Sequence, residues 1–69
     1  MSVRIGIDVG GTFTDAVAID NETFELIGSA KVPTTHNAPE GVAAGIVQAL
    51  HQVLETQNIA PEDVVFIAH

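Results

Sequence analysis

The sequence has no cysteine and almost no positive charge. Of its 69 residues only Arg4 and Lys31 are basic, and the formal net charge is −7. Without cysteine the chain can form neither disulfides nor a thiolate metal cluster, which is typical of the reducing cytoplasm, where we expect it to act. Proteins that bind nucleic acids or anionic membranes depend on clustered lysine and arginine. We therefore expect neither a nucleic acid nor a membrane as a partner.

The sequence also lacks a long apolar run, a basic N-terminal segment and any internal repeat. A membrane-spanning helix needs about 20 consecutive apolar residues, and a secretory signal needs a basic start and a small-residue cleavage site. Neither is expected here. A chain of 69 residues forms at most one small domain, and such a domain buries only about 60% of its unfolded surface.

Alternating and β-branched residues predict three strands in the first half of the chain. Residues 3–9 alternate between apolar and other side chains, which is the period of a strand. Residues 12–20 and 24–32 are apolar enough for two more strands, with a polar turn at 21–23 and a candidate bulge at Gly28. Because short connections join antiparallel neighbours, we expect the first three strands to be antiparallel.

One helix and a last strand are predicted in the second half. Asn37 is a good N-cap with Glu40 three residues later, and the helix should continue to about Gln57. Its apolar stripe comprises Val42, Ile46, Leu50 and Leu54, widened by Ala43, Val47 and Val53. Residues 64–68 are apolar without alternation, which predicts a strand buried on both faces. Since this strand follows a helix, we expect it to lie parallel to the first strand.

Residues 6–15, with the sequence GIDVGGTFTD, hold the densest group of chemically useful side chains. Paired glycines in a tight turn let backbone N–H groups approach a phosphate, and Asp8 lies close enough to handle a nucleotide's metal. The candidate site residues are Asp8, Gly10, Gly11, Thr12, Thr14 and Asp15. An ordinary hairpin also uses paired glycines, simply to reach positive φ. A carboxylate on an otherwise apolar strand favours phosphate binding, because its burial is costly unless it is paired or metal-linked.

Two other phosphate-binding motifs are excluded. The dinucleotide pattern G-x-G-x-x-G is absent, and no helix directly follows the glycines. A P-loop needs a lysine directly after its glycines, whereas the nearest lysine in the sequence is Lys31. The histidines at 36, 51 and 69 are too scattered for a metal site. Any phosphate must therefore be bound by backbone amides, hydroxyls and a divalent cation.

Residues 6–15 resemble the N-terminal signature of the hydantoinase/oxoprolinase family, and the likeness continues through residues 31–35, 39–42 and 59–63. This family belongs to the actin- and hexokinase-like ATPases, whose first lobe opens with β-β-β-α-β in a ribonuclease-H-like sheet. The expected fold is therefore an α/β, ribonuclease-H-like half-lobe. Its sheet is mixed, with the first three strands antiparallel and the last parallel to the first, and it carries one long helix.

The same resemblance implies roles for the candidate residues. Asp8 would hold Mg²⁺ through water and orient the attacking group. The β- and γ-phosphates of ATP would be contacted by Gly10, Gly11, Thr12 and Thr14. Asp15 would either take part in the site or lock the turn by accepting backbone N–H bonds. The implied reaction is ATP-dependent opening of a lactam or imide ring, hydantoin or 5-oxoproline in type, after phosphorylation of the ring carbonyl oxygen.

Members of the family are many times longer, so we expect residues 1–69 to be the N-terminal part of a nucleotide-binding lobe. Such an incomplete domain should be inactive alone. Three alternatives stay open: a fragment of an acetone-carboxylase-type subunit, a sugar-kinase-like lobe and a non-catalytic interaction module. The continuation Phe13-Thr14-Asp15 favours the hydantoinase type over the sugar kinases. We also expect self-association through the open edge of residues 64–68.

Overall fold

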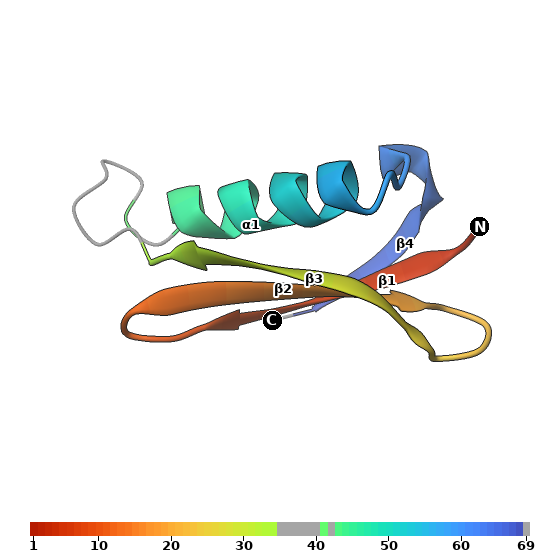
Figure 1. The fold of residues 1–69 in the computed structure, drawn as a ribbon, viewed down its shortest axis with the longest axis horizontal. Coiled ribbons are helices and arrows are strands. Elements are labelled where there is room, and N and C mark those ends of the chain that lie inside the picture. The colour runs from red at the N-terminus through yellow and green to blue at the C-terminus, as the bar shows by residue number, and fades with distance from the viewer. Residues whose placement is uncertain (35–40, 42, 69) are drawn as a thin grey trace.

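The chain folds into one four-stranded sheet with a single α-helix lying along one of its faces (Figure 1). The computed structural model describes residues 1–34, 41 and 43–68. The elements, in chain order, are β1 (Val3–Val9), β2 (Phe13–Asp20), β3 (Leu26–Pro33), α1 (Ala43–Thr56), a 3₁₀ turn (Pro61–Asp63) and β4 (Val64–Ala68).

The strand order in the sheet is β3-β2-β1-β4. β1 pairs antiparallel with β2, and β2 pairs antiparallel with β3, whereas β1 and β4 run parallel. This arrangement confirms the predicted α/β class and mixed sheet. The helix supplies the crossover that a parallel pair requires, because a short turn cannot return the chain to the same end of a sheet.

β3 begins later than predicted because the turn before it is longer. Phe24 adopts a positive φ of 61°, and its N–H donates to the carbonyl oxygen of Asp20 over 2.8 Å. The Asp20 carboxylate accepts the N–H of Glu22 at 2.8 Å and of Thr23 at 3.1 Å. Residue 24 therefore belongs to the turn, and pairing with β2 starts at Leu26.

The bulge expected at Gly28 is confirmed beside that residue. The β2–β3 register shifts between Ala18 and Ile19, which pair with Gly28 and Leu26, so Ile27 is the extra residue on β3. A Cβ on Gly28 would collide with the side chain of Gln57, which follows the end of α1. The glycine beside the bulge thus gives the Gln57 side chain at the helix end room to lie on the sheet.

The core lies between α1 and the sheet. It contains Val3, Ile5, Ile7, Ala16, Ala18, Ala30, Val32, Ala49, Val53 and Ile59. The helix contacts β2 and β3 more than β1, and the small side chains on those two strands let it approach closely. The buried helix residues are accordingly Gly45, Ala49 and Val53, with Ile46, Leu50 and Leu54 half-buried beside them.

Part of the predicted helix stripe is wrong. Val47 is 51% exposed and Ala43 is also exposed, because the helix packs on the line of its smallest side chains rather than on its largest ones. Val53 is fully buried as predicted. The predicted capping residues Asn37 and Glu40, together with stripe residue 42, lie outside the described residues.

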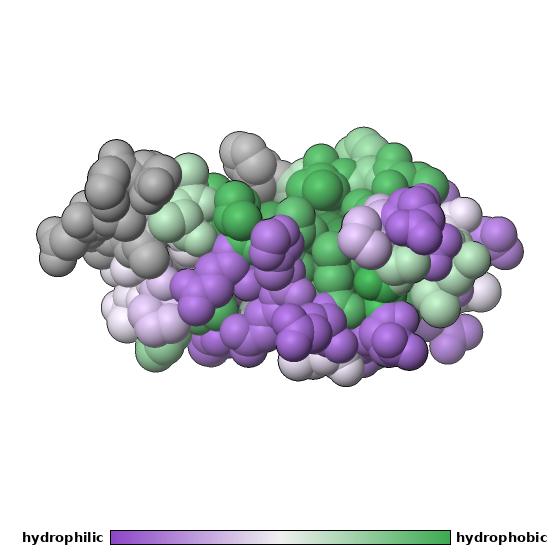
Figure 2. Space-filling view, turned by 90° about the horizontal axis from the view of Figure 1, so that it is seen from above, coloured by the Kyte–Doolittle hydropathy of each residue, from purple (hydrophilic) through white to green (hydrophobic). Residues whose placement is uncertain are grey.

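The prediction that β4 is buried on both faces is also wrong. Val65, Phe66 and Ile67 are 56%, 52% and 49% exposed. β4 is an edge strand, and α1 lies over β2 and β3 instead of over it. An apolar groove lined by Leu50, His51, Leu54, Pro61, Val64 and Ile67 therefore separates the helix from β4. Seen from the helix side, hydrophobic residues gather in one band beside a hydrophilic one (Figure 2).

Among the described residues, no helix has the length and apolar character needed to cross a membrane.

Candidate functional site

The two glycines form the bend that joins β1 to β2. The N–H of Gly10 donates to the carbonyl oxygen of Phe13 over 2.9 Å and closes the bend. Gly10, Gly11 and Thr12 are exposed, and the strands leave the bend with Val9 opposite Thr14. The candidate residues 10–12 therefore form a solvent-facing tip at one end of the sheet.

Gly10 and Gly11 differ in how much space surrounds the position of a Cβ atom. A Cβ on Gly10 would lie 3.0 Å from the Phe13 carbonyl oxygen, so the bend itself disfavours a larger residue there. A Cβ on Gly11 would meet nothing within 4 Å, and Gly11 does not have the positive φ that favours glycine. Packing among the described residues therefore does not require glycine at position 11.

Thr14 and Thr34 hold the bend from the helix side of the sheet. Thr14 is fully buried, and its Oγ1 lies 3.0 Å from Oγ1 of Thr34. The Thr34 hydroxyl donates to the Gly10 carbonyl oxygen over 2.8 Å, and its N–H donates to the Thr12 carbonyl oxygen over 2.9 Å. Thr14 therefore faces away from the exposed tip, and its hydroxyl already has a protein partner.

A row of charged side chains crosses the face of the sheet opposite α1, here called the open face. The row consists of Asp8, Asp15 and Lys31. Asp8 pairs with Asp15 in the β1–β2 register, and Asp15 pairs with Lys31 in the β2–β3 register. Nζ of Lys31 lies 3.9 Å from Oδ1 of Asp15 and 5.3 Å from the centre of the Phe13 ring. Both charged side chains of this ion pair are largely exposed, so it contributes less than about 1 kcal/mol to stability.

The other basic side chain lies at the opposite end of the same face. The Arg4 guanidinium lies 5.1 Å from the Phe24 ring centre and 5.2 Å from that of Phe66. Its Nε also donates to Oδ1 of Asn21 over 3.0 Å. Arg4 thus contacts both the turn between β2 and β3 and strand β4. Lys31 is the basic residue at the glycine end of the sheet.

A shallow hollow of about 360 Å³ lies beside the two carboxylates on the open face. Its lining is Gly6, Ile7, Asp8, Asp15, Val17 and Ala68. The small residues at positions 6 and 68 recess its floor, and a Cβ on Gly6 would come within 3.2 Å of Cγ2 of Val17. The hollow is therefore mostly apolar, with its charge concentrated at the Asp8–Asp15 end.

The two carboxylates of Asp8 and Asp15 have the chemistry of a site that shares a magnesium ion with a bound phosphate. Mg²⁺ binds through one or two carboxylates together with waters and substrate phosphates. Asp8 and Asp15 supply such carboxylates beside an exposed glycine bend. Within the described ranges no group of three or more His, Cys, Asp or Glu residues could hold a metal by itself.

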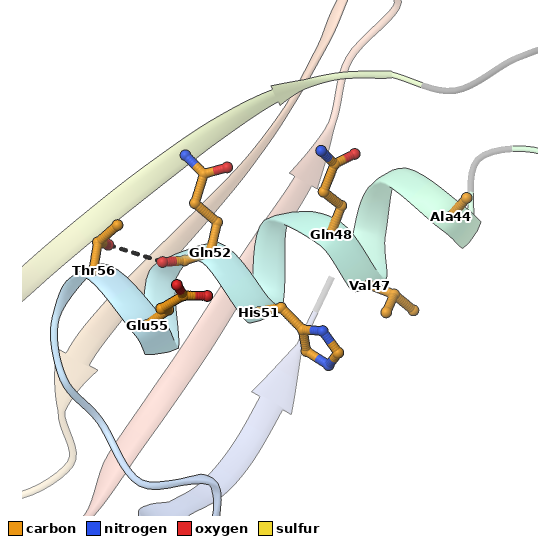
Figure 3. A pocket seen from close by; sticks show the side chains of 7 residues that line it. All are labelled: Ala44, Val47, Gln48, His51, Gln52, Glu55 and Thr56. Carbon is orange, nitrogen blue, oxygen red and sulfur yellow. Dashed lines mark hydrogen bonds between the residues drawn. The ribbon is translucent and has the colours of Figure 1, made fainter.

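Another hollow, lined by residues of α1, lies along the exposed side of that helix and has no pair of neighbouring carboxylates (Figure 3). His51 and Val47 point to one side of the helix, whereas Gln48 and Gln52 point to the other. The hydrogen bond drawn there joins the Thr56 hydroxyl to the Gln52 carbonyl within the helix, over 2.8 Å. These side chains do not converge on one point, so this surface lacks the arrangement of a binding site.

The structure thus brings most of the predicted site residues together. Asp8 and Asp15 share the open face, and the exposed bend of residues 10–12 adjoins them. Thr14 lies on the opposite face. Two contributors were missed from the sequence, Thr34 and Lys31. Thr34 directly follows the strand-closing Pro33, and this position beside the end of a strand was the available signal.

The chain matches the hydantoinase/oxoprolinase N-terminal region over residues 4–69. An uncharacterized protein of Methanocaldococcus jannaschii is 39% identical to it over 59 residues, which are 86% of this chain and 8% of that protein. The chain therefore spans a small part of the length of the curated relative that it matches. No solved structure matches the chain.

Proposed function

Because this chain belongs to the hydantoinase/oxoprolinase family, we propose that it supplies the phosphate-binding bend of an ATP-dependent hydrolase that opens cyclic amides. The observation that carries the proposal is the exposed glycine bend of residues 10–12, which lies beside the carboxylates of Asp8 and Asp15. A bend with little side-chain bulk lets a phosphate approach the backbone, as a nucleotide site needs.

Each part of the bend has a role in this proposal. Phosphoryl transfer depends mainly on positioning and on neutralising charge, and the sheet end offers main-chain groups, the Thr12 hydroxyl and two carboxylates. Asp8 would hold Mg²⁺ through water, and the bend from Gly10 to Thr12 would contact the β- and γ-phosphates. When bound, MgATP supplies the phosphoryl group that activates the ring carbonyl for attack by water.

Thr14 and Asp15 are assigned according to their contacts. The hydroxyl of Thr14 is bonded to Thr34 behind the bend, so we propose that it supports the phosphate-binding backbone rather than the phosphate itself. Asp15 has the Lys31 ammonium beside it. Since Asp15 already has a cationic neighbour, we assign the metal to Asp8.

Ring opening is proposed for the whole protein, not for residues 1–69 alone. The 59 residues aligned with the curated relative make up 8% of that protein, and phosphoryl transfer needs groups placed around both the nucleotide and the second substrate. We therefore expect no steady-state ATP hydrolysis by the 69-residue chain. A cyclic amide substrate and a cytoplasmic location remain part of the same proposal.

The test is an amide chemical-shift titration of the ¹⁵N-labelled 69-residue chain with MgADP. We expect shifts centred on Gly10, Gly11 and Thr12, which weaken when magnesium is removed with EDTA. Asp8→Asn should reduce the affinity, because the metal loses its carboxylate. Glu62→Gln, which removes an exposed carboxylate from the far 3₁₀ turn, is the matched control and should bind like the parent chain. An unresponsive bend at millimolar MgADP would contradict the proposal.

A further inference from the structure

Thr34 is the residue that connects the end of β3 to the glycine bend. The β2–β3 register pairs Phe13 with Pro33, so the residue after Pro33 lies directly beside the bend. Pro33 lacks an N–H and closes the strand, which frees the chain to turn toward the glycines. Thr34 is half-buried there and contacts the bend through both its side chain and its backbone.

Three hydrogen bonds join Thr34 to the bend and its support. Its hydroxyl lies 2.8 Å from the Gly10 carbonyl oxygen and 3.0 Å from the Thr14 hydroxyl. Its N–H lies 2.9 Å from the Thr12 carbonyl oxygen. Since the Thr34 hydroxyl has one proton and gives it to Gly10, the Thr14 hydroxyl donates to Thr34. The chain of donors therefore runs from Thr14 through Thr34 to Gly10.

These bonds determine how the peptide planes of the bend are oriented. In a trans peptide the carbonyl and the following N–H point in opposite directions, and the described peptide bonds are all trans. When Thr34 holds the Gly10 carbonyl on the helix side, the Gly11 N–H must point to the other side. The bond from the Thr34 N–H to the Thr12 carbonyl joins the start of β2 to the end of β3.

We infer that Thr34 is a positioning residue of the phosphate-binding bend, an inference that rests on the proposed function. It acts through the Gly10 and Thr12 carbonyls and fixes the conformation of the bend before a ligand arrives. Orientation before binding removes an entropic cost that the ligand would otherwise bear. A valine of similar shape could fill the same space, so the hydroxyl is needed for orientation rather than for packing.

The test compares Thr34→Val and Thr34→Ser in the 69-residue chain, with MgADP as the ligand. Loss of one hydrogen bond of about 1 kcal/mol predicts binding about five-fold weaker for Thr34→Val. Thr34→Ser keeps the hydroxyl and should bind as the parent does. The Gly11 amide resonance should move in the valine variant even without ligand. Thr23→Val is the matched control, because its hydroxyl serves the other turn by accepting the Glu25 N–H at 3.3 Å.

Each outcome bears on the inference. Equal binding by the parent and Thr34→Val, with an unmoved Gly11 resonance, would overturn it and leave the proposed function standing. A parent chain that does not respond to MgADP would overturn both. If Thr34→Val does not fold, Thr34→Ala and Thr34→Ser are compared instead, since they differ only by the hydroxyl. Serine binding about five-fold tighter than alanine would support the inference, and equal binding would overturn it.

Discussion

The two glycines of the bend differ in the space that a side chain would have at each position. At Gly10 the nearest obstacle to a side chain is a backbone oxygen, that of Phe13, which also accepts the Gly10 N–H. At Gly11 the space around the Cβ position is empty. A backbone oxygen in a closed turn cannot move aside without loosening the hydrogen bond, whereas empty space tolerates a methyl group. The fold therefore requires the first glycine, whereas packing among the described residues does not require the second.

This difference predicts opposite behaviour for two alanine substitutions. Gly10→Ala should destabilise the chain by about 1 kcal/mol, the net value of the closing hydrogen bond. Gly11→Ala should leave the free energy of unfolding unchanged within about 0.5 kcal/mol. Both should weaken MgADP binding, because a methyl group keeps the phosphate from the backbone. Urea unfolding followed by circular dichroism measures the stability, and equal losses for the two variants would contradict the assignment.

The Asp20 turn predicts a specific pH dependence. The N–H groups of Glu22 and Thr23 that donate to its carboxylate hold the pKa of Asp20 below its ordinary value of 3.8. A lowered pKa stabilises the folded chain at pH values above 3.8, and this contribution is lost as the pH falls through the lowered pKa. Asp20→Ala should therefore unfold more easily than the parent at pH 6, with a difference that shrinks toward pH 2.

The control for this experiment is Glu22→Ala, which removes an exposed carboxylate from the same turn. It should lower the melting temperature less than Asp20→Ala at pH 6. A gap between parent and Asp20→Ala that stays constant from pH 6 to pH 2 would show that the carboxylate charge does not stabilise the turn.

At the residue scale, the sequence predicted the parts of the site that are close in the chain. Asp8, the glycines and Asp15 lie within one hairpin, so their proximity follows from the short connection between two strands. Thr34 and Lys31 come from β3 and its end, and their positions depend on the β2–β3 register. That register includes a bulge at Ile27, which local patterns do not locate to the residue.

At the scale of the elements, the helix shows how packing overrides the apparent apolar stripe. The line of closest approach to the sheet runs through Gly45, Ala49 and Val53. Large aliphatic residues on the neighbouring line, such as Ile46, are only half-buried. Hydrophobicity alone gives the larger residues more weight, but the alanines of β2 and β3 favour a close contact made by small residues.

Two valines of the predicted stripe test whether the helix packs on that stripe or on the line of Gly45, Ala49 and Val53. Val53 is fully buried, so Val53→Ala should destabilise the chain by about 2 kcal/mol through lost burial and a cavity. Val47 is 51% exposed, and Val47→Ala should change stability by less than about 0.5 kcal/mol. Thermal or urea unfolding of both variants is the measurement. A large loss at position 47 would place the helix on the sheet differently.

The existence and order of the elements were predicted correctly because each has a strong local signal. Alternation marks β1, polar turns separate β2 and β3, and the change to a helical period marks α1. The environment of β4 was not predicted correctly. An unbroken apolar run indicates burial on both faces only when layers cover both faces, and among the described residues the layer over the sheet reaches mainly β2 and β3.

At the scale of the whole molecule, the sheet has one face covered by α1 and one face open, with β4 at an edge (Figure 1). Ile67 of β4 lines the groove beside the helix, and Val65 and Phe66 of the same strand are also exposed. An edge strand of this kind can pair with another strand. Self-association through β4 therefore remains our prediction for the 69-residue chain.

Val65→Lys should reduce this self-association, because a charged residue on an edge strand disfavours pairing. Val65 is 56% exposed and is the extra residue where the β1–β4 register shifts, so the lysine can remain in solvent. Val47→Lys makes the same change on the exposed side of α1 and should associate as the parent does. Sedimentation velocity over a concentration series measures the effect. A parent chain that is monomeric at every concentration would contradict the prediction.

The hydrogen bonds of Thr34 also affect how the bend opens. Since this residue joins the end of β3 to the connection between β1 and β2, three strand ends meet at one junction. An ordinary hairpin tip frays independently, but here separation requires β3 to detach as well. Solvent exchange of the amide protons at this junction should therefore be cooperative, with common protection factors, and should slow together when the β2–β3 ladder is strengthened.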